Sequence, residues 1–239
     1  MQELIEPPSQ GVAPHESRNG LRRAPAAVRG MSRSRAPIPG TGRRLACQGE
    51  NRFVTLLFSD MCRSLETTRD FLPEEAAAFV NRLLVVMVDA ILTYEGSIDR
   101  FQGDGALAVF GMAHVRTENP ERAIRAAMLI RVGARCLGLD VTAGINTGAV
   151  YVGPVGSERH HETMIMGPAV GLAARLQGLA QPGQILVSEA TQRLTRHAFE
   201  FTPLTLSIKG LAQPIVGYVV ERALRLPEKA RSRERCAAG

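Results

Sequence analysis

The sequence predicts a mixed α/β domain with the element order βαββαβ, spanning residues 51–221 between two basic tails that we expect to be disordered. Three observations predict this fold class. A short apolar run begins at Phe53, a segment of helical period follows from Pro73, and two short apolar runs flank a glycine-bracketed aspartate, Asp104. A core of about 170 residues is large enough to fold without disulfides or metals.

The first strand and the first long helix have the clearest signals. The run FVTLLFS from Phe53 is apolar and partly β-branched, which is typical of a buried strand, and Asp60 follows it directly. Pro73-Glu74-Glu75 then begins a helix that is expected to end near Thr93. Apolar side chains recur on one face of this helix, at Phe79, Leu83, Val86 and Ala90.

Turn and cap signals predict the remaining elements. Residues 96–101 and 105–110 form two strands of a hairpin around Gly103-Asp104-Gly105, and Asn119-Pro120-Glu121 caps a second helix to about Cys136. The last expected elements are strands at 141–146 and 149–152 around Thr147-Gly148, a helix at 169–180, a strand at 184–187, a short helix from Ser188, and strands at 201–208 and 215–219.

The net charge of +6 is unevenly distributed. Residues 51–220 hold 15 Lys and Arg against 16 Asp and Glu, whereas 8 Arg precede residue 51 and 6 Lys and Arg follow residue 220. The core is therefore close to neutral, and no specific nucleic-acid partner is predicted. The tails, residues 1–50 and 222–239, are expected to be solvated; weak, salt-sensitive attraction to an anionic membrane or to nucleic acid is the alternative.

Cysteine usage and hydropathy favour a cytoplasmic protein. The four cysteines form no C-x-x-C pair, which suits a reducing compartment. The longest apolar run, residues 83–92, is interrupted by Asp89, so no transmembrane segment is predicted. The first ten residues lack the positive and apolar regions of a secretory signal.

Asp60 and Asp104 form the most informative pair of residues. One ends the first strand and the other lies in the turn of the next hairpin, and in a βαββ arrangement these two positions can be neighbours. Two carboxylates beside open backbone amides suit Mg²⁺, which takes its other ligands from substrate phosphates and water. The alternative is that each aspartate only ends a strand or makes a turn.

Five motifs occur in the order found in class III nucleotidyl cyclases, the adenylyl and guanylyl cyclase catalytic domains, and the sequence resembles that family. The motifs are VTLLFSD, FQGDGALAVFG, AGINTGAVYVG, GLAARL and PGQILVSEAT. The resemblance extends to the closing SIKGLAQPI. It implies a ferredoxin-like, palm-type α/β cyclase fold that works as a head-to-tail homodimer, with each active site drawn from both subunits.

The resemblance also implies a reaction. ATP, with GTP as the variant, would become 3′,5′-cyclic AMP and pyrophosphate by in-line attack of the ribose 3′-hydroxyl. Asp60 and Asp104 match the aspartates that bind two Mg²⁺ or Mn²⁺ ions, one activating the hydroxyl and one holding the triphosphate. Arg175 matches the arginine that the partner subunit directs at the transition state. Lys209 resembles a triphosphate-binding lysine, with a solvated strand-end lysine as the alternative.

Four positions depart from the family pattern. Arg63 stands where a glycine is usual; it either strains the backbone, if the position requires a positive φ, or contacts phosphate itself. Arg100 replaces the purine-reading lysine and remains a donor for adenine N1. Met164 stands at the partner purine-reading position and offers no hydrogen bond. Gly171 stands where an asparagine orients the ribose.

These departures leave two classes of function open. The first is a slow cytoplasmic adenylate cyclase, because losing one transition-state contact typically costs about 10²–10³ in rate while both metal aspartates remain. Guanylate cyclase activity is its nearest variant. The second is a catalytically degenerate cyclase-like module that serves in regulation or dimerisation. The adjacent His160-His161 is interpreted as a solvated loop, and no zinc site is predicted.

Overall fold

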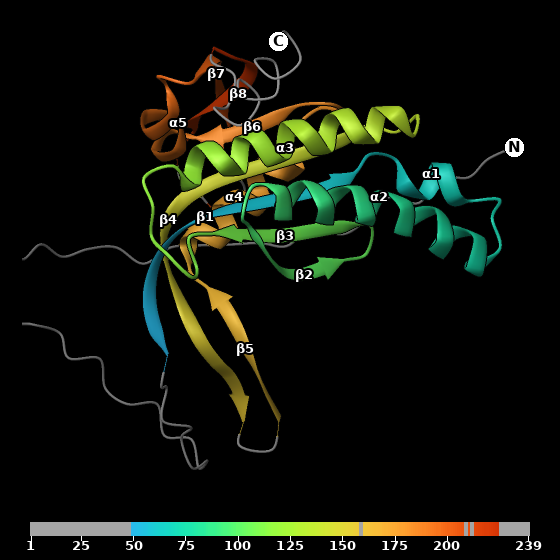
Figure 1. Cartoon of the computed structure of the whole chain (residues 1–239), viewed down its shortest axis with the longest axis horizontal. Helices are drawn as coiled ribbons and strands as arrows, with labels where there is room; N and C mark the ends of the chain where they lie inside the picture. The colour runs from blue at the N-terminus through green and yellow to red at the C-terminus, as the bar shows by residue number, and fades with distance from the viewer. Residues whose placement is uncertain (1–48, 158–159, 208–209, 211–212, 225–239) are drawn as a thin grey trace, which may run out of the picture. The chain divides into compact units, whose positions relative to one another are not determined.

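The computed structural model describes residues 49–157, 160–207, 210 and 213–224 (Figure 1). An eight-stranded sheet has the order β2-β3-β1-β4-β6-β8-β7, and β5 pairs with β4. The strands are β1 (Glu50–Met61), β2 (Ser97–Gln102), β3 (Gly105–Phe110), β4 (Val141–Ser157), β5 (His160–Met166), β6 (Ile185–Ser188), β7 (Phe199–Leu206) and β8 (Ile215–Ala223). The helices are α1 (Ser64–Thr68), α2 (Pro73–Thr93), α3 (Asn119–Cys136), α4 (Pro168–Leu179) and α5 (Glu189–Thr195). Residues 1–48 and 225–239, which hold most of the two predicted tails, lie outside the described residues.

Strand β1 lies in the middle of the sheet, as its apolar run predicts. It pairs antiparallel with β3 on one side and with β4 on the other, so that Leu57 lies opposite both Ala108 and Ile145. Every residue of β1 from Val54 to Ser59 is buried. The order β2-β3-β1-β4 is that of a ferredoxin-like βαββαβ unit, which confirms the predicted fold class.

Helices cover both faces of the sheet (Figure 1). On one face Leu57 of β1 packs in a core cluster with Met87 of α2 and Ile130 of α3. On the other face Leu56 of β1 packs in a cluster with Ala173 of α4. Because successive side chains of a strand point to opposite faces, both sets of β1 side chains are buried.

Helix α2 begins and ends where the sequence predicts. The backbone N–H of Leu72 donates to the Glu75 carboxylate at 2.9 Å, which caps the first turn. Among the described helices, α2 is long and apolar enough to cross a membrane by length and composition alone. Its Leu83 and Met87 belong to the core cluster under the sheet, whereas Val85 and Leu92 are exposed.

Strands β4 and β5 correct two expectations. The predicted interruption at Thr147-Gly148 is absent, because Thr147 stays in register opposite Thr55 and β4 continues unbroken to Ser157. The segment with His160-His161 is not a loop but the start of β5, which forms a hairpin with the far half of β4 that projects from the sheet in Figure 1. Most β5 side chains are exposed, so the segment carries no apolar signal.

Candidate active site

Asp60 and Asp104 meet at one end of the sheet. Asp60 is the penultimate residue of β1, and Asp104 lies in the turn between β2 and β3. The Met61 backbone N–H donates to Asp60 Oδ1 at 3.1 Å. A side chain on Gly105 would place its Cβ 2.7 Å from Asp60 Oδ1, so only glycine lets β3 approach this carboxylate so closely.

The surroundings of Asp60 perturb its carboxyl group. Burial and the nearby charge of Asp104 raise the pKa of Asp60 from its usual 3.8 to about 6. Asp104 Oδ2 is buried and has no hydrogen-bond partner among the described residues. An oxygen in this condition is costly unless something binds it, and a divalent cation is a suitable partner for such a pair.

No group of three or more His, Cys, Asp or Glu side chains comes together among the described residues. Asp60 and Asp104 therefore form a pair, without a third such side chain beside them in the described part of the chain. Two carboxylates are a sufficient protein contribution for Mg²⁺, because this ion keeps several waters and binds substrate phosphates.

Arg63 adopts the left-handed conformation. Its φ is 55° and its ψ is 37°, and it stands at the N-cap of the short helix α1, which the sequence did not predict. The Arg63 carbonyl accepts hydrogen bonds from the backbone and the hydroxyl of Thr67. The position thus has the positive φ that a glycine would adopt without strain, and the exposed Arg63 side chain is not fixed by these contacts.

Arg100, Met164 and Gly171 line one pocket of about 280 Å³. They come from β2, β5 and α4, three elements far apart in sequence. Asp99 holds the Arg100 guanidinium, with 2.7 Å between Nε and Oδ2. Gln102 lines the same pocket, and sequence reasoning missed it. Alternate residues of a strand point to the same face, so the position of Gln102 two residues after Arg100 could have predicted that both side chains face this pocket.

Arg175 lies one turn after Gly171 on α4, so the two share a face of that helix. Its side chain is exposed, and its guanidinium lies beside Gly210, 3.6 Å from the position of a Cβ built there. Lys209 lies outside the described residues. Neither Asp60, Asp104 nor Arg175 is among the residues that line the Arg100 pocket.

Comparison with known families matches residues 48–222 to the adenylate and guanylate cyclase catalytic domain. The match covers most of the chain. The chain therefore belongs to this family, as its five motifs predicted, and its domain is a class III nucleotidyl cyclase domain.

Solved structures agree with this assignment. The adenylyl cyclase CyaB from P. aeruginosa is similar with a TM-score of 0.71 at 26% identity, over 74% of this chain and 98% of that one. The guanylyl cyclase Cya2 is similar with a TM-score of 0.67 at 31% identity, over 73% of this chain and 94% of that one. These two proteins are named for different bases, so their similarity to this chain does not select between ATP and GTP.

Curated relatives include two uncharacterized proteins of Mycobacterium tuberculosis. One is 33% identical over 150 residues, which are 61% of this chain and 26% of the relative. The other is 29% identical over 174 residues, which are 70% of this chain and 32% of the relative. The chain thus spans about a third or less of the length of each of these relatives.

Proposed function

We propose that this domain is an active adenylate cyclase that makes 3′,5′-cyclic AMP and pyrophosphate from ATP for intracellular signalling in the cytoplasm. The observation that carries the proposal is the carboxylate pair formed by Asp60 and Asp104. One of these groups has a raised pKa and the other has a buried oxygen without a partner among the described residues. Such perturbed acidic pairs are typical of functional sites.

Asp60 and Asp104 would hold two Mg²⁺ or Mn²⁺ ions. Bound there, the ions would lower the pKa of the ribose 3′-hydroxyl and offset the negative charge of the triphosphate. The fit rests on the buried Asp104 Oδ2, which has no partner in the described part of the chain, and on the repulsion between the two carboxylates, since a cation relieves both costs.

The reaction forms a bond between the ribose O3′ and the α-phosphorus, breaks the bond from that phosphorus to pyrophosphate, and releases the proton of the 3′-hydroxyl to water. Negative charge builds on the α-phosphate as this happens, and Arg175 is our candidate to stabilise it with its planar guanidinium. Arg100 would donate to adenine N1, and Gln102 would add a carboxamide to the base site. Arg63 and Lys209 are candidates for contacts with the triphosphate.

We propose that the active unit is a head-to-tail homodimer. The lining of the Arg100 pocket within one chain includes neither Asp60 nor Asp104. A nucleotide in that pocket would need these groups from a second copy, which supports sites shared between subunits. Arg175 is exposed, so it is accessible to a partner.

A catalytically degenerate regulatory module is the second candidate. It is favoured by Met164 and Gly171, which line the base pocket and offer no side-chain hydrogen bond to base or ribose. A fold that keeps the pocket but loses its polar groups would retain dimerisation and lose turnover.

Product formation tests the proposal. The full chain is incubated with ATP or GTP, in parallel with Mn²⁺ and Mg²⁺, beside the Asp60→Ala variant. Cyclic AMP that disappears in the variant supports the adenylate cyclase, and cyclic GMP alone would change the substrate to GTP. No product from a folded dimer at high concentration would favour the regulatory module.

A further inference from the structure

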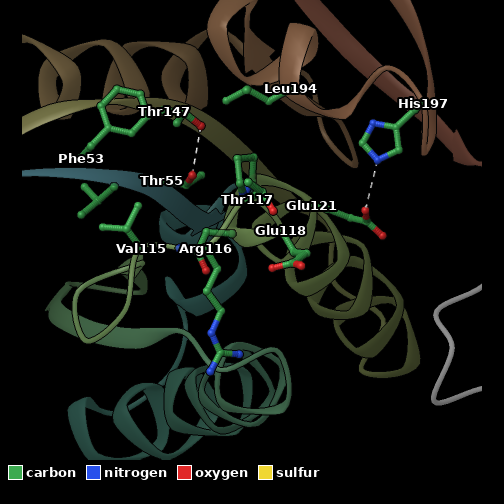
Figure 2. Close-up of a pocket in the computed structure, with 13 residues that line it drawn as sticks. Phe53, Thr55, Val115, Arg116, Thr117, Glu118, Glu121, Thr147, Leu194 and His197 are labelled. Atoms are coloured by element: carbon green, nitrogen blue, oxygen red, sulfur yellow. Dashed lines mark hydrogen bonds and ion pairs between the residues drawn. The ribbon is translucent and has the colours of Figure 1, made fainter.

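A second pocket lies beside the first half of β1, at Phe53 and Thr55 (Figure 2). Its volume is about 380 Å³, within the range of pockets that hold small molecules. Its lining includes Phe53 and Thr55 of β1, Val115 before α3, Thr147 of β4 and Leu194 of α5. It shares no lining residue with the pocket of Arg100 and Met164, so it is a separate site.

Apolar side chains form much of the wall. Phe53, Val115 and Leu194 surround the hydrogen bond between Thr55 and Thr147 in Figure 2. These three side chains are 54%, 65% and 46% exposed, respectively. Exposed apolar groups gathered around one hollow indicate a binding site more strongly than the same groups scattered over a surface.

Thr55 and Thr147 line the pocket and belong to a row of buried hydroxyls that continues away from it. Thr55 Oγ1 lies 3.0 Å from Thr147 Oγ1, which lies 3.0 Å from Thr191 Oγ1, which lies 3.2 Å from Ser188 Oγ. Four hydroxyls in a row make three hydrogen bonds, so capacity is left at the ends. If each hydroxyl donates to its neighbour on the Thr55 side, the Thr55 O–H proton remains free to donate to a ligand. If each hydroxyl donates to its neighbour on the Ser188 side, a Thr55 lone pair remains free to accept from a ligand. In both cases Thr55 can bind one polar group of a ligand.

The charges at the rim disfavour an anion. Arg116 donates to Glu95 at 3.1 Å, and Arg122 donates to the same carboxylate oxygen at 2.8 Å, so the Arg116 guanidinium is held in an ion pair at the rim. Glu121 lies 2.8 Å from Arg125 and 3.7 Å from His197, and Glu118 adds a second carboxylate at the start of α3. The described lining therefore offers one arginine, which is already in an ion pair, against two carboxylates, and this balance disfavours a phosphate or a nucleotide.

We propose that this pocket binds an uncharged, mainly apolar small molecule that carries one hydrogen-bonding group, with Thr55 as the polar anchor. The proposal does not depend on cyclase activity. The ligand would contact β1 at Phe53 and Thr55, and the same strand carries Asp60, so the pocket is placed to regulate the acidic site.

The probe for the test is N-phenyl-1-naphthylamine, an uncharged aromatic amine with one N–H group that fluoresces in apolar surroundings. We expect saturable binding of one probe per full-length chain. Leu194→Trp, which fills the pocket, should weaken binding at least tenfold. Thr55→Val should weaken it about three- to tenfold, the usual effect of one hydrogen bond. Val132→Trp alters an exposed apolar residue elsewhere on α3 and should leave binding unchanged.

The matched anionic probe is 8-anilinonaphthalene-1-sulfonate, which has the same rings and a sulfonate. We expect it to bind more weakly than the uncharged amine, although the chain has a net charge of +6. Nuclear Overhauser effects from the bound amine to the methyl groups of Leu194 and Val115 keep the test valid if Thr55→Val does not fold. No saturable binding, binding unchanged in Leu194→Trp, tighter binding of the sulfonate, or contacts only to other methyl groups would overturn the proposal.

Discussion

Burial raises the pKa of Asp60, the nearby charge of Asp104 adds to the effect, and the resulting pKa is about 6. In the absence of metal, Asp60 therefore keeps its proton up to a higher pH than an ordinary aspartate does. At neutral pH the Asp60 carboxyl is mostly ionised, and a bound cation would offset its charge. This relationship makes the pair a destabilising feature of the metal-free fold, and it leads to the first prediction.

Metal-free protein should lose stability between about pH 4 and pH 7. The folded-state pKa of Asp60 is above its usual 3.8, so the contribution to the free energy of unfolding is complete below pH 3.8 and is lost as the pH rises through about 6. Urea unfolding in EDTA across this range measures the loss, and Asp104→Asn should reduce it. Mn²⁺ should restore stability at pH 7. The same pH profile in both proteins, with no effect of Mn²⁺, would contradict the account.

Arg63→Gly should raise the free energy of unfolding by about 1 kcal/mol, because a non-glycine residue in the left-handed region is strained. Arg63→Ala keeps the strain and is the matched control for urea unfolding. The same two variants show whether the Arg63 side chain contacts phosphate. In that case both should raise KM for the nucleotide to a similar degree; an unchanged KM in both would exclude the contact.

Gly171→Asn should increase kcat. Nothing lies within 4 Å of a Cβ built on Gly171, so the new side chain fits and can supply the ribose contact that the family resemblance implies. The control is Gly178→Asn on the same helix. A Cβ built on Gly178 also has nothing within 4 Å, and Gly178 does not line the Arg100 pocket. Helix propensity changes alike in both variants. An equal effect of the two variants on steady-state kcat would show that position 171 has no special role.

Met164→Asp should shift the selectivity towards ATP. A carboxylate at this place in the pocket can accept from the adenine N6 amine and would repel the guanine O6, which should change the ratio of kcat/KM values for ATP and GTP about tenfold. Thr163→Asp places the same charge on the neighbouring residue of β5, which does not line the pocket. If both variants change the ratio equally, the effect is one of charge alone.

The sequence predicted those elements whose pattern of apolar residues matches the pattern of buried residues in the structure. Strand β1 and helices α2 and α3 have strong apolar patterns, and the proximity of Asp60 and Asp104 follows from the order of the elements. Strand β5 escaped prediction because it is mostly exposed and is held by pairing with β4 rather than by a core. The apparent turn at Gly148 was wrong because glycine in a strand also allows close packing; a Cβ there would lie 3.1 Å from the Ala169 Cβ.

The functional residues likewise fall into those that sequence motifs predict and those that only the folded chain reveals. Motifs predicted the positions of Asp60, Asp104 and Arg100, but the pKa of Asp60 depends on burial that only the folded chain provides. Gln102 and the pocket above Thr55 carry no motif, because their neighbours come from elements distant in sequence. The roles of the candidate residues remain predictions until variants are measured.

Mixing two inactive variants is the most direct test of the central claim, a cyclase with active sites shared between subunits. Asp60→Ala and Arg175→Ala should each lack activity alone. In an equal mixture half of the dimers are mixed, and each has one complete site of two, so cyclic AMP production should recover to about a quarter of the wild-type rate. No recovery from a mixture shown to exchange subunits, or full activity of Arg175→Ala alone, would contradict the account.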